Sequence, residues 1–374
     1  MRLLALAVLA CLPSGEEETA LTNVRIIPVA SGEIEGGTLV VRGGKIAAVG
    51  KGIRPPAGAR VVDGTGLTVF PGLVHPASRL GLGEAPAGLS GVTPQNLVYD
   101  ELNPSLEAFA RARGTGVTLF GVQPGGGAVA GQGLALKPGP DTREGLVADR
   151  TAFLRLSMQS STAVKEALRQ AFEGGRKALE AEKKTPAPKP DDRNLPLVRF
   201  LKGEIPGHVS IAGAADAAHF LQVWERFEEF KVRIVFLASG DSYKAAELLG
   251  ARKALVVVRP DPAFAPFTRD RVNPAAEFAR AGCVVAFAPG GDTPEALETH
   301  LFLASQAVKH GLGRGAALRA LTLSGAEALG WEKRSGSIEA GKDADLLLLD
   351  GDPLGASTRV RAVWVDGREV YRGD

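Results

Sequence analysis

The sequence predicts an α/β protein in which a block of strand–helix units is inserted between the two halves of a small β domain. Short runs rich in Val, Ile and Thr fill residues 21–70 and return in residues 344–371, so both ends of the chain are expected to be β. Between them, apolar strand-like runs alternate with amphipathic helical runs, which is the pattern of βα units around a parallel sheet. The 47 glycines and 24 prolines are typical of a chain with many tight turns.

The first β segment is divided by turn residues. We expect five strands in it, at residues 21–29, 37–42, 45–50, 60–63 and 67–70. Gly43-Gly44 between two strand-like runs is the clearest hairpin signal, and Pro71-Gly72 closes the segment. The C-terminal segment predicts three more strands, at residues 344–349, 360–365 and 369–371. We expect the two segments to pair as one β domain.

The middle of the chain alternates between helix and strand. Helices are expected at residues 106–113, 163–184, 214–230, 243–249, 275–281, 293–310 and 315–328, and strands at residues 116–122, 208–211, 233–237, 254–258 and 283–288. Residues 125–133 predict a glycine-rich loop, which lacks the Gly-Lys-Ser/Thr that a phosphate-binding P-loop requires. The proline-rich residues 185–192 end the longest helix.

Composition excludes several classes of protein. With 45% hydrophobic and 23% charged residues, the chain can offset the entropy cost of ordering, so we expect a folded protein. Lys and Arg number 44 and Asp and Glu 42, so no strong positive field indicates nucleic acid as a partner. The two cysteines cannot form a disulfide framework. Two methionines and two cysteines in 374 residues lean towards a protein from a thermophile.

The N-terminus resembles an export signal. Arg2 precedes an apolar run over residues 3–12, and Val8-Leu9-Ala10-Cys11 is similar to a bacterial lipobox, in which Cys11 would be lipidated. We therefore expect residues 1–20 to be a signal or lipoprotein-like segment with an acidic spacer, and the protein to be periplasmic or anchored at the envelope. A misplaced start codon is the alternative, with a cytoplasmic protein.

Six phrases at the two ends of the chain carry a family resemblance. They are residues 43–50 (GGKIAAVG), 62–64 (VDG), 69–74 (VFPGLV), 336–346 (GSIEAGKDADL), 350–354 (DGDPL) and 363–367 (VWVDG). Because these six phrases occur together and in this order, the chain resembles the amidohydrolase superfamily and its imidazolonepropionase-like branch. The resemblance implies a (β/α)8 TIM-type barrel over residues 73–336 and a small composite β-sandwich domain from residues 21–72 and 337–374. It also implies hydrolysis of non-peptide C–N bonds by a metal-activated water at the carboxyl ends of the barrel strands.

The metal ligands that the resemblance implies are not in the sequence. After Pro-Gly-Leu-Val the family places Asp-x-His-x-His, whereas this chain has His75, Ala77 and Arg79 at those three positions. Alanine offers only a methyl group, and arginine keeps a positive charge that repels a metal ion.

The later strands also lack the metal ligands that the resemblance implies. The second His-x-His of the family corresponds to Ser210 and Ala212, and the next histidine corresponds to Ala238. We therefore expect no cofactor and no tightly bound divalent metal. We also expect Arg79 to point into the vacated space, towards Asp292.

Asp292 is the candidate catalytic residue that remains. It follows the last predicted barrel strand, where the resemblance implies a proton-shuttling aspartate, but an aspartate before Thr-Pro also suits an N-cap. His75 is a remote candidate ligand. His219 is expected to be packed or half-exposed, His208 to cap or pack at its strand, and His300 and His310 to lie on the surface of a helix.

Three functions follow. The first is a degenerate amidohydrolase that binds a small molecule at the barrel mouth or acts as a scaffold. The second is an active hydrolase with a rewired mononuclear site, zinc-type, built from His75, Asp292 and either His208 or Asp241. The third is a non-catalytic envelope subunit that supports an active paralogue, or a homo-oligomer.

Overall fold

The computed structural model describes residues 18–83, 91–103, 107–140, 142–184, 191–265 and 267–373. The expected export segment, including Arg2 and Cys11, lies almost entirely outside the described residues. Within the described ranges, the helices include none that is both long and apolar enough to cross a membrane.

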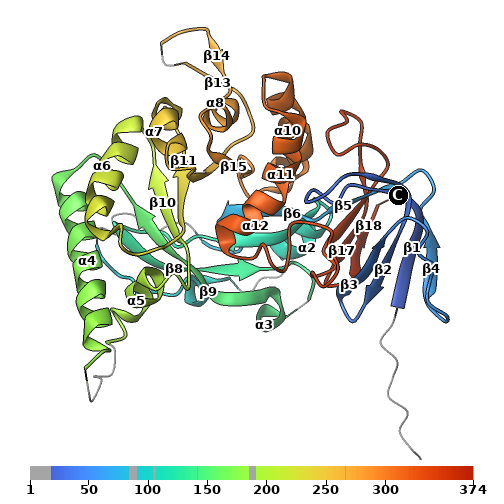
Figure 1. Ribbon diagram of the computed structural model, residues 1–374, viewed down its shortest axis with the longest axis horizontal. Helices are drawn as coiled ribbons and strands as arrows, with labels where there is room; N and C mark the ends of the chain where they lie inside the picture. The colour runs from blue at the N-terminus through green and yellow to red at the C-terminus, as the bar shows by residue number, and fades with distance from the viewer. Residues whose placement is uncertain are drawn as a thin grey trace, which may run out of the picture.

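Both ends of the chain build one sheet. Seven of its eight strands follow the order β18-β17-β16-β5-β1-β2-β3, and the eighth, β4, pairs with β1 outside this order. The strands are β1 Glu18–Ile26, β2 Ile34–Arg42, β3 Lys45–Gly50, β4 Arg60–Asp63, β5 Thr68–Pro71, β16 Leu346–Leu349, β17 Val360–Val365 and β18 Arg368–Arg372. The antiparallel pairing of β5 with β16 joins the two ends, and Figure 1 shows the blue and red strands side by side at one end of the molecule. Apolar side chains such as Leu21, Val69, Leu346 and Trp364 fill its core. The expected β-sandwich built from both chain ends is confirmed.

The second sheet is a nearly closed barrel. Its strands follow the order β6 Leu73–Ser78, β7 Val117–Val122, β8 Val129–Leu136, β9 Val147–Ser157, β10 Gly207–Ile211, β11 Ile234–Ala238, β12 Leu255–Val258 and β15 Val284–Phe287. The last strand, β15, lies beside the first, β6, so the sheet curls round on itself. The expected TIM-type barrel is therefore confirmed, and a two-stranded ribbon, β13 Ala263–Phe264 with β14 Arg271–Val272, stands outside it.

One barrel strand runs against the others. β8 pairs antiparallel with both β7 and β9, whereas the sequence predicts a loop over residues 125–133. The glycines there allow close packing: a Cβ at Gly133 would lie 2.0 Å from the ring of Phe153, and one at Gly131 would lie 2.6 Å from the carbonyl oxygen of Asn96. Glycine in a strand can mark such a close approach of neighbouring groups.

The helices surround the barrel, with one exception. Their bounds are α1 Val98–Glu101, α2 Glu107–Arg113, α3 Arg143–Leu146, α4 Thr162–Ala181, α5 Leu195–Leu201, α6 Ala214–Trp224, α7 Ala246–Gly250, α8 Pro274–Arg280, α9 Pro294–Glu298, α10 His300–Lys309, α11 Arg314–Leu321 and α12 Leu323–Leu329. α12 closes the end of the barrel where the parallel strands begin, because Ala326 and Leu329 pack with Val74, Leu119 and Phe153 from the barrel strands. The opposite end, where the parallel strands finish, is the mouth of the barrel.

Two helices that the sequence predicts as continuous are broken. The helix expected over 293–310 divides at Thr299 into α9 and α10, and the helix expected over 315–328 divides at Thr322 into α11 and α12. Each threonine hydroxyl donates to a carbonyl four residues earlier, Thr299 to Glu295 and Thr322 to Leu318. Such a bond competes with the helical backbone and favours a bend.

Candidate binding site at the barrel mouth

The interior of the barrel is largely apolar at the positions where the resemblance implies metal ligands. Ala77 of β6 packs in one cluster with Val257 of β12 and Ala286 of β15. Successive residues of a strand face opposite sides of the sheet, so this cluster identifies the inward face of each strand. Ala77 stands on that face and offers only its methyl group.

On β11, the position that the resemblance names does not face the interior of the barrel. Ala238 packs with the cluster on the outer face of the barrel, whereas Leu237 packs with the inner one. Because side chains alternate along a strand, an alignment that is wrong by one residue exchanges the two faces. The inward position is therefore Leu237, which also has no metal-binding atom.

Ser210 and Ala212 on the β10 side are not free ligands. The Ser210 hydroxyl accepts a hydrogen bond from a guanidinium nitrogen of Arg155, a residue of β9 that sequence analysis did not select. Ala212 lies just beyond β10, where its backbone N–H donates to Asp216 Oδ2 at 3.0 Å. The signal for Arg155 was a single charge in the apolar run Phe153-Leu154-Arg155-Leu156.

Arg155 is held by neutral acceptors. Its Nη1 donates to the Leu156 carbonyl at 2.5 Å and to the His208 carbonyl at 3.4 Å. Burial and the positive charge of Arg79 lower the pKa of Arg155 to about 10, so the guanidinium stays protonated at neutral pH. A permanent cation therefore occupies the interior on the side where the resemblance implies a metal.

His208 is fully buried and uses both nitrogens of its ring. Nε2 lies 2.8 Å from the Ala328 carbonyl of α12, and Nδ1 lies 3.0 Å from the side-chain nitrogen of Gln123. A carbonyl accepts and an amide nitrogen donates, so Nε2 carries the proton and Nδ1 accepts. Burial lowers the pKa of His208 to about 3, which keeps the ring neutral. With no lone pair free, His208 does not suit the rewired metal site.

Asp292 is bound to the end of β6. It accepts hydrogen bonds from the Ser78 hydroxyl and, at 2.8 Å, from the backbone N–H of Arg79, and its Oδ1 lies 3.3 Å from Nε2 of the buried His75. Burial would raise the pKa of Asp292, but His75, Ser78 and the Arg79 N–H together hold it below its ordinary value. Asp292 thus stays ionised, with both oxygens already engaged.

This group has the wrong order for nucleophilic catalysis. In a Ser-His-Asp triad the histidine stands between serine and aspartate and takes the serine proton. Here Asp292 stands between Ser78 and His75, so the imidazole does not reach the hydroxyl through a direct bond. The N-cap of α9 is also not Asp292 but Thr293, whose hydroxyl accepts from the Ala296 N–H at 3.3 Å.

Arg79 does not make the expected side-chain pair with Asp292. Its guanidinium instead donates to the Gln123 carbonyl at 3.4 Å and to the Gly83 carbonyl at 3.2 Å. Arg79 meets Asp292 through its backbone N–H, because Arg79 follows β6, Asp292 follows β15, and these two strands are neighbours.

The remaining candidates lie apart from the mouth or are already paired. Asp241 pairs with Lys244 at 3.0 Å, and His219 and His310 are half-buried on helices. His300 is completely buried, contrary to the surface position expected, and its ring lies edge-on to Phe287. Burial lowers its pKa to about 3.

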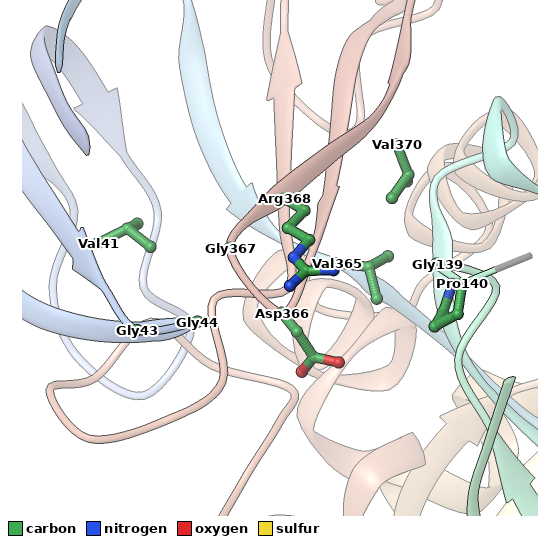
Figure 2. A pocket seen from close by; sticks show the side chains of 10 residues that line it. All are labelled: Val41, Gly43, Gly44, Gly139, Pro140, Val365, Asp366, Gly367, Arg368 and Val370. Carbon is green, nitrogen blue, oxygen red and sulfur yellow. The ribbon is translucent and has the colours of Figure 1, made fainter. Parts of the chain in front are cut away.

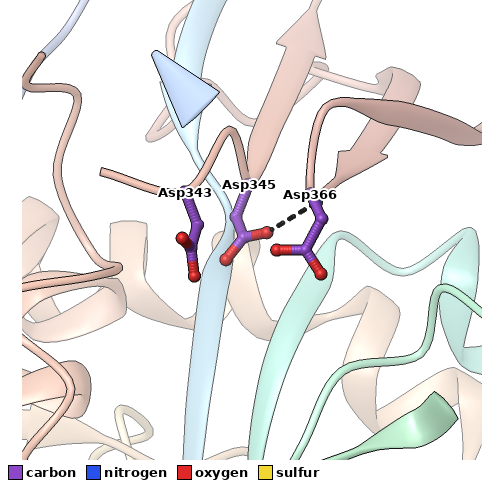
Figure 3. A group of neighbouring side chains, drawn as sticks. All are labelled: Asp343, Asp345 and Asp366. Atoms are coloured by element: carbon purple, nitrogen blue, oxygen red, sulfur yellow. Dashed lines mark hydrogen bonds between the residues drawn. The ribbon is translucent and has the colours of Figure 1, made fainter. Parts of the chain in front are cut away.

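The described residues contain one convergent group of acidic side chains, and it lies where the barrel meets the β-sandwich. Asp343, Asp345 and Asp366 have carboxylate oxygens within 4.8 Å of one another (Figure 3). Their common partner is the buried Lys137, whose Nζ lies 2.9 Å from Asp343, 2.9 Å from Asp345 and 2.6 Å from Asp366. The lysine ammonium thus offsets part of the cluster's negative charge. Sequence analysis missed this arrangement because Lys137 lies more than 200 residues from the three aspartates.

A cavity of about 600 Å³ lies next to this cluster, between the sandwich and the segment after β8. Figure 2 shows its walls, which are mostly glycine, valine and proline, with Asp366 and Arg368 as the charged side chains. Because Asp366 is committed to Lys137, the cavity presents few groups that could fix a ligand.

The donor set at the barrel mouth does not fit a catalytic metal ion. Such a site needs about three protein ligands with free lone pairs and an open position for water. The positions named by the resemblance hold Ala77, Arg79, Ser210, Ala212 and Ala238, with Leu237 in place of Ala238 on the inward face. Two arginines at the mouth further oppose a dication.

Comparisons with known proteins agree on one family. The amidohydrolase family model matches residues 266–371. The crystal structure of an amidohydrolase from Thermotoga maritima superposes with a TM-score of 0.80 at 27% identity, over 95% of this chain and 100% of that one. The amidohydrolase tasK of Hapsidospora irregularis is 40% identical over 81 residues, which are 21% of this chain and 8% of that protein.

More distant structures share the fold. A prolidase complexed with N-methylphosphonate-L-proline has a TM-score of 0.60 at 17% identity, over 95% of this chain and 100% of that one. An adenosine deaminase from Xanthomonas campestris with bound zinc has a TM-score of 0.54 at 19% identity, over 96% of this chain and 93% of that one. The chain is thus similar to amidohydrolases in sequence over residues 266–371, and its fold is similar to that of the Thermotoga amidohydrolase over nearly its whole length.

Proposed function

We propose that this amidohydrolase-superfamily protein is catalytically degenerate and binds a small molecule at the barrel mouth without metal-dependent hydrolysis. The observation that carries the proposal is the bond from Arg155 to Ser210, because it puts a protonated guanidinium beside a position where the resemblance implies an imidazole ligand. Fold alone does not decide function, which depends on the groups in the site.

The rewired hydrolase is the competing function. In its favour, His75 and Asp292 lie 3.3 Å apart and His75 is buried. Against it, Asp292 already accepts bonds from Ser78 and the Arg79 N–H, and His208 has no free lone pair. Lys244 in turn pairs with Asp241. The rewired site therefore lacks the three ligands that a catalytic metal requires.

Metal analysis of the purified full chain, combined with a hydrolysis screen on amides and cyclic C–N substrates, tests the proposal. We expect well under one equivalent of zinc, iron, manganese or nickel, no turnover, and a Tm that chelators leave unchanged. Stoichiometric metal that is lost in His75→Ala or Asp292→Ala, but kept in the surface control Arg280→Ala, would establish the rewired hydrolase instead.

A further inference from the structure

Among the described residues, two arginines at the barrel mouth bond only to neutral groups. Arg155 donates to the carbonyls of Leu156 and His208 and to the Ser210 hydroxyl, and Arg79 donates to the carbonyls of Gln123 and Gly83. A guanidinium has five N–H donors. Within the described part of the chain, two donors of Arg155 and three of Arg79 are thus left for another acceptor.

The two guanidinium groups belong to the same part of the mouth. Arg155 bonds the carbonyl of His208, and the side chain of His208 contacts the side chain of Gln123, whose carbonyl in turn accepts from Arg79. The charges are close enough that Arg79 contributes to the lowered pKa of Arg155. Two like charges in a poorly solvated place repel each other, so the arrangement is unfavourable without an anion.

Other cations of the described chain do have carboxylate partners, and two cases show the contrast. Buried Lys137 has three of them, and Arg314 pairs with both Glu33 and Asp352. No described carboxylate lies within 4.0 Å of the guanidinium of Arg79 or Arg155. A buried charge is normally paired, so a missing counter-ion indicates a place for a charged ligand.

We propose that the barrel mouth binds the carboxylate of a small organic acid, with Arg155 and Arg79 as the groups that hold its two oxygens. This inference rests on the proposed function, since it names the ligand class of the same site. Arginine matches the planar carboxylate through paired N–H donors. The inward side chains of Leu237, Val257 and Ala286 form an apolar cluster inside the barrel, so the proposal expects the remainder of the ligand to be apolar.

A singly charged acid fits better than a phosphate. Asp292 stays ionised at the end of β6, and it would repel a dianion more strongly than a monoanion. An apolar body next to the carboxylate also uses the Leu237 side of the interior, which inorganic phosphate does not contact.

The test uses the purified full chain and four probes: acetate, isovalerate, benzoate and inorganic phosphate, each against chloride at equal ionic strength. Calorimetric titration and thermal shift should give saturable binding of isovalerate or benzoate, weaker binding of acetate, and the weakest response to phosphate. No saturable binding of any carboxylate would overturn the proposal. Phosphate as the tightest probe would overturn it as well, in favour of a phosphate site.

Variants separate binding from folding. Arg155→Met should weaken the carboxylate at least tenfold and leave the ligand-free Tm equal or higher, because a buried unpaired charge is lost. The carboxylate affinity of Arg155→Lys should lie between those of the wild type and Arg155→Met, since lysine keeps the charge but lacks the paired N–H donors. Arg79→Met should also weaken binding of the carboxylate. If Arg155→Met does not fold, Arg79→Met and Arg155→Lys together provide the test. The exposed Arg280, which pairs with Glu277, is the control: Arg280→Met should bind as the wild type does. Unchanged affinity in both Arg155→Lys and Arg79→Met would overturn the proposal.

The two proposals fail in different ways. A metal-free, inactive protein that binds no carboxylate would disprove the ligand class and leave the degenerate function standing. A protein with stoichiometric metal and turnover would disprove the degenerate function, whatever its affinity for carboxylates.

Discussion

The Nδ1 atom of His208 lies 3.0 Å from the side-chain nitrogen of Gln123, inside a barrel where the superfamily resemblance implies histidines bound to metal. The other ring nitrogen bonds the Ala328 carbonyl, and the ring stacks on Phe153 with centroids 4.0 Å apart. His208 thus ties β7, β9 and β10 to the helix α12 that closes the barrel. Its role is structural, and the protein keeps a histidine in the barrel interior without offering it as a ligand.

Two buried histidines should respond oppositely to replacement by leucine. His208→Leu leaves the Ala328 carbonyl without its donor and removes the stacked ring, so we expect a loss of about 2–3 kcal/mol in the free energy of unfolding. Neither ring nitrogen of His300 has a hydrogen-bond partner among the described residues, so His300→Leu should be neutral or stabilising by about 1 kcal/mol. Differential scanning calorimetry of the two variants measures this contrast. A His300→Leu protein that melts well below the wild type would show that the imidazole has a partner.

Stability should fall between pH 7 and pH 5 because of the same two residues. Burial lowers the pKa of His208 and His300 to about 3, far below the value of about 6.5 in an unfolded chain. Below pH 6.5 the unfolded state therefore binds protons that the folded state does not, and stability is lost as the pH falls. The contribution of each histidine should steepen as the pH falls and approach about 1.4 kcal/mol per pH unit near pH 5, where the unfolded imidazole is fully protonated.

The variant His300→Leu isolates this effect. Comparing it with the wild type at each pH cancels the other titrating groups, and its unfolding free energy should fall less steeply by the contribution of one histidine. Chemical unfolding in buffers from pH 7 to pH 5 gives both slopes. Equal slopes in the two proteins would mean that His300 titrates alike in the folded and unfolded states.

Lys137 should be essential for the junction between the barrel and the sandwich. Burial alone would lower its pKa, but Asp345, Asp366 and Asp343 raise it above the ordinary value, so the ammonium is firmly charged. Lys137→Met leaves buried carboxylates without a cation, and we expect a loss of about 3–5 kcal/mol of stability. The matched control is Lys244→Met, since Lys244 is exposed and pairs only with the half-exposed Asp241. Thermal melts should separate the two variants by many degrees, and similar melting points would contradict this role for Lys137.

Local signals in the sequence were sufficient for most of the fold. The Gly43-Gly44 turn joins β2 to β3 as expected, because hairpin geometry depends on the residues of the turn itself. The position of Arg155 inside the barrel could not be predicted from such local signals. Alternation puts it on the face opposite Leu154 and Leu156, but only the closed sheet, with β8 inserted antiparallel, decides that this face is the interior.

The site was harder to predict for the same reason. Ala238 and Leu237 differ by one position, and this difference decides which side chain enters the barrel. Lys137 meets Asp366 across 229 residues, a distance over which spacing in the sequence carries no information. By contrast, the absence of any His-x-His motif can be read directly from the sequence, because it depends on residue identity alone.

The last prediction separates a structural aspartate from a catalytic one. Asp292 accepts from the Ser78 hydroxyl and the Arg79 N–H and lies beside His75, so it fixes the end of β6 to the segment after β15. Asp292→Ala leaves two buried or half-buried donors unpaired and should cost about 2 kcal/mol of stability, whereas Asp292→Asn keeps an acceptor and should cost less. Glu295→Ala, on the exposed first turn of α9, is the control and should melt as the wild type does. Catalytic residues are commonly replaced with little loss of stability, or even a gain, because function and stability compete at active sites. An Asp292→Ala protein with an unchanged or higher Tm would therefore count against the structural role and return Asp292 to the list of catalytic candidates.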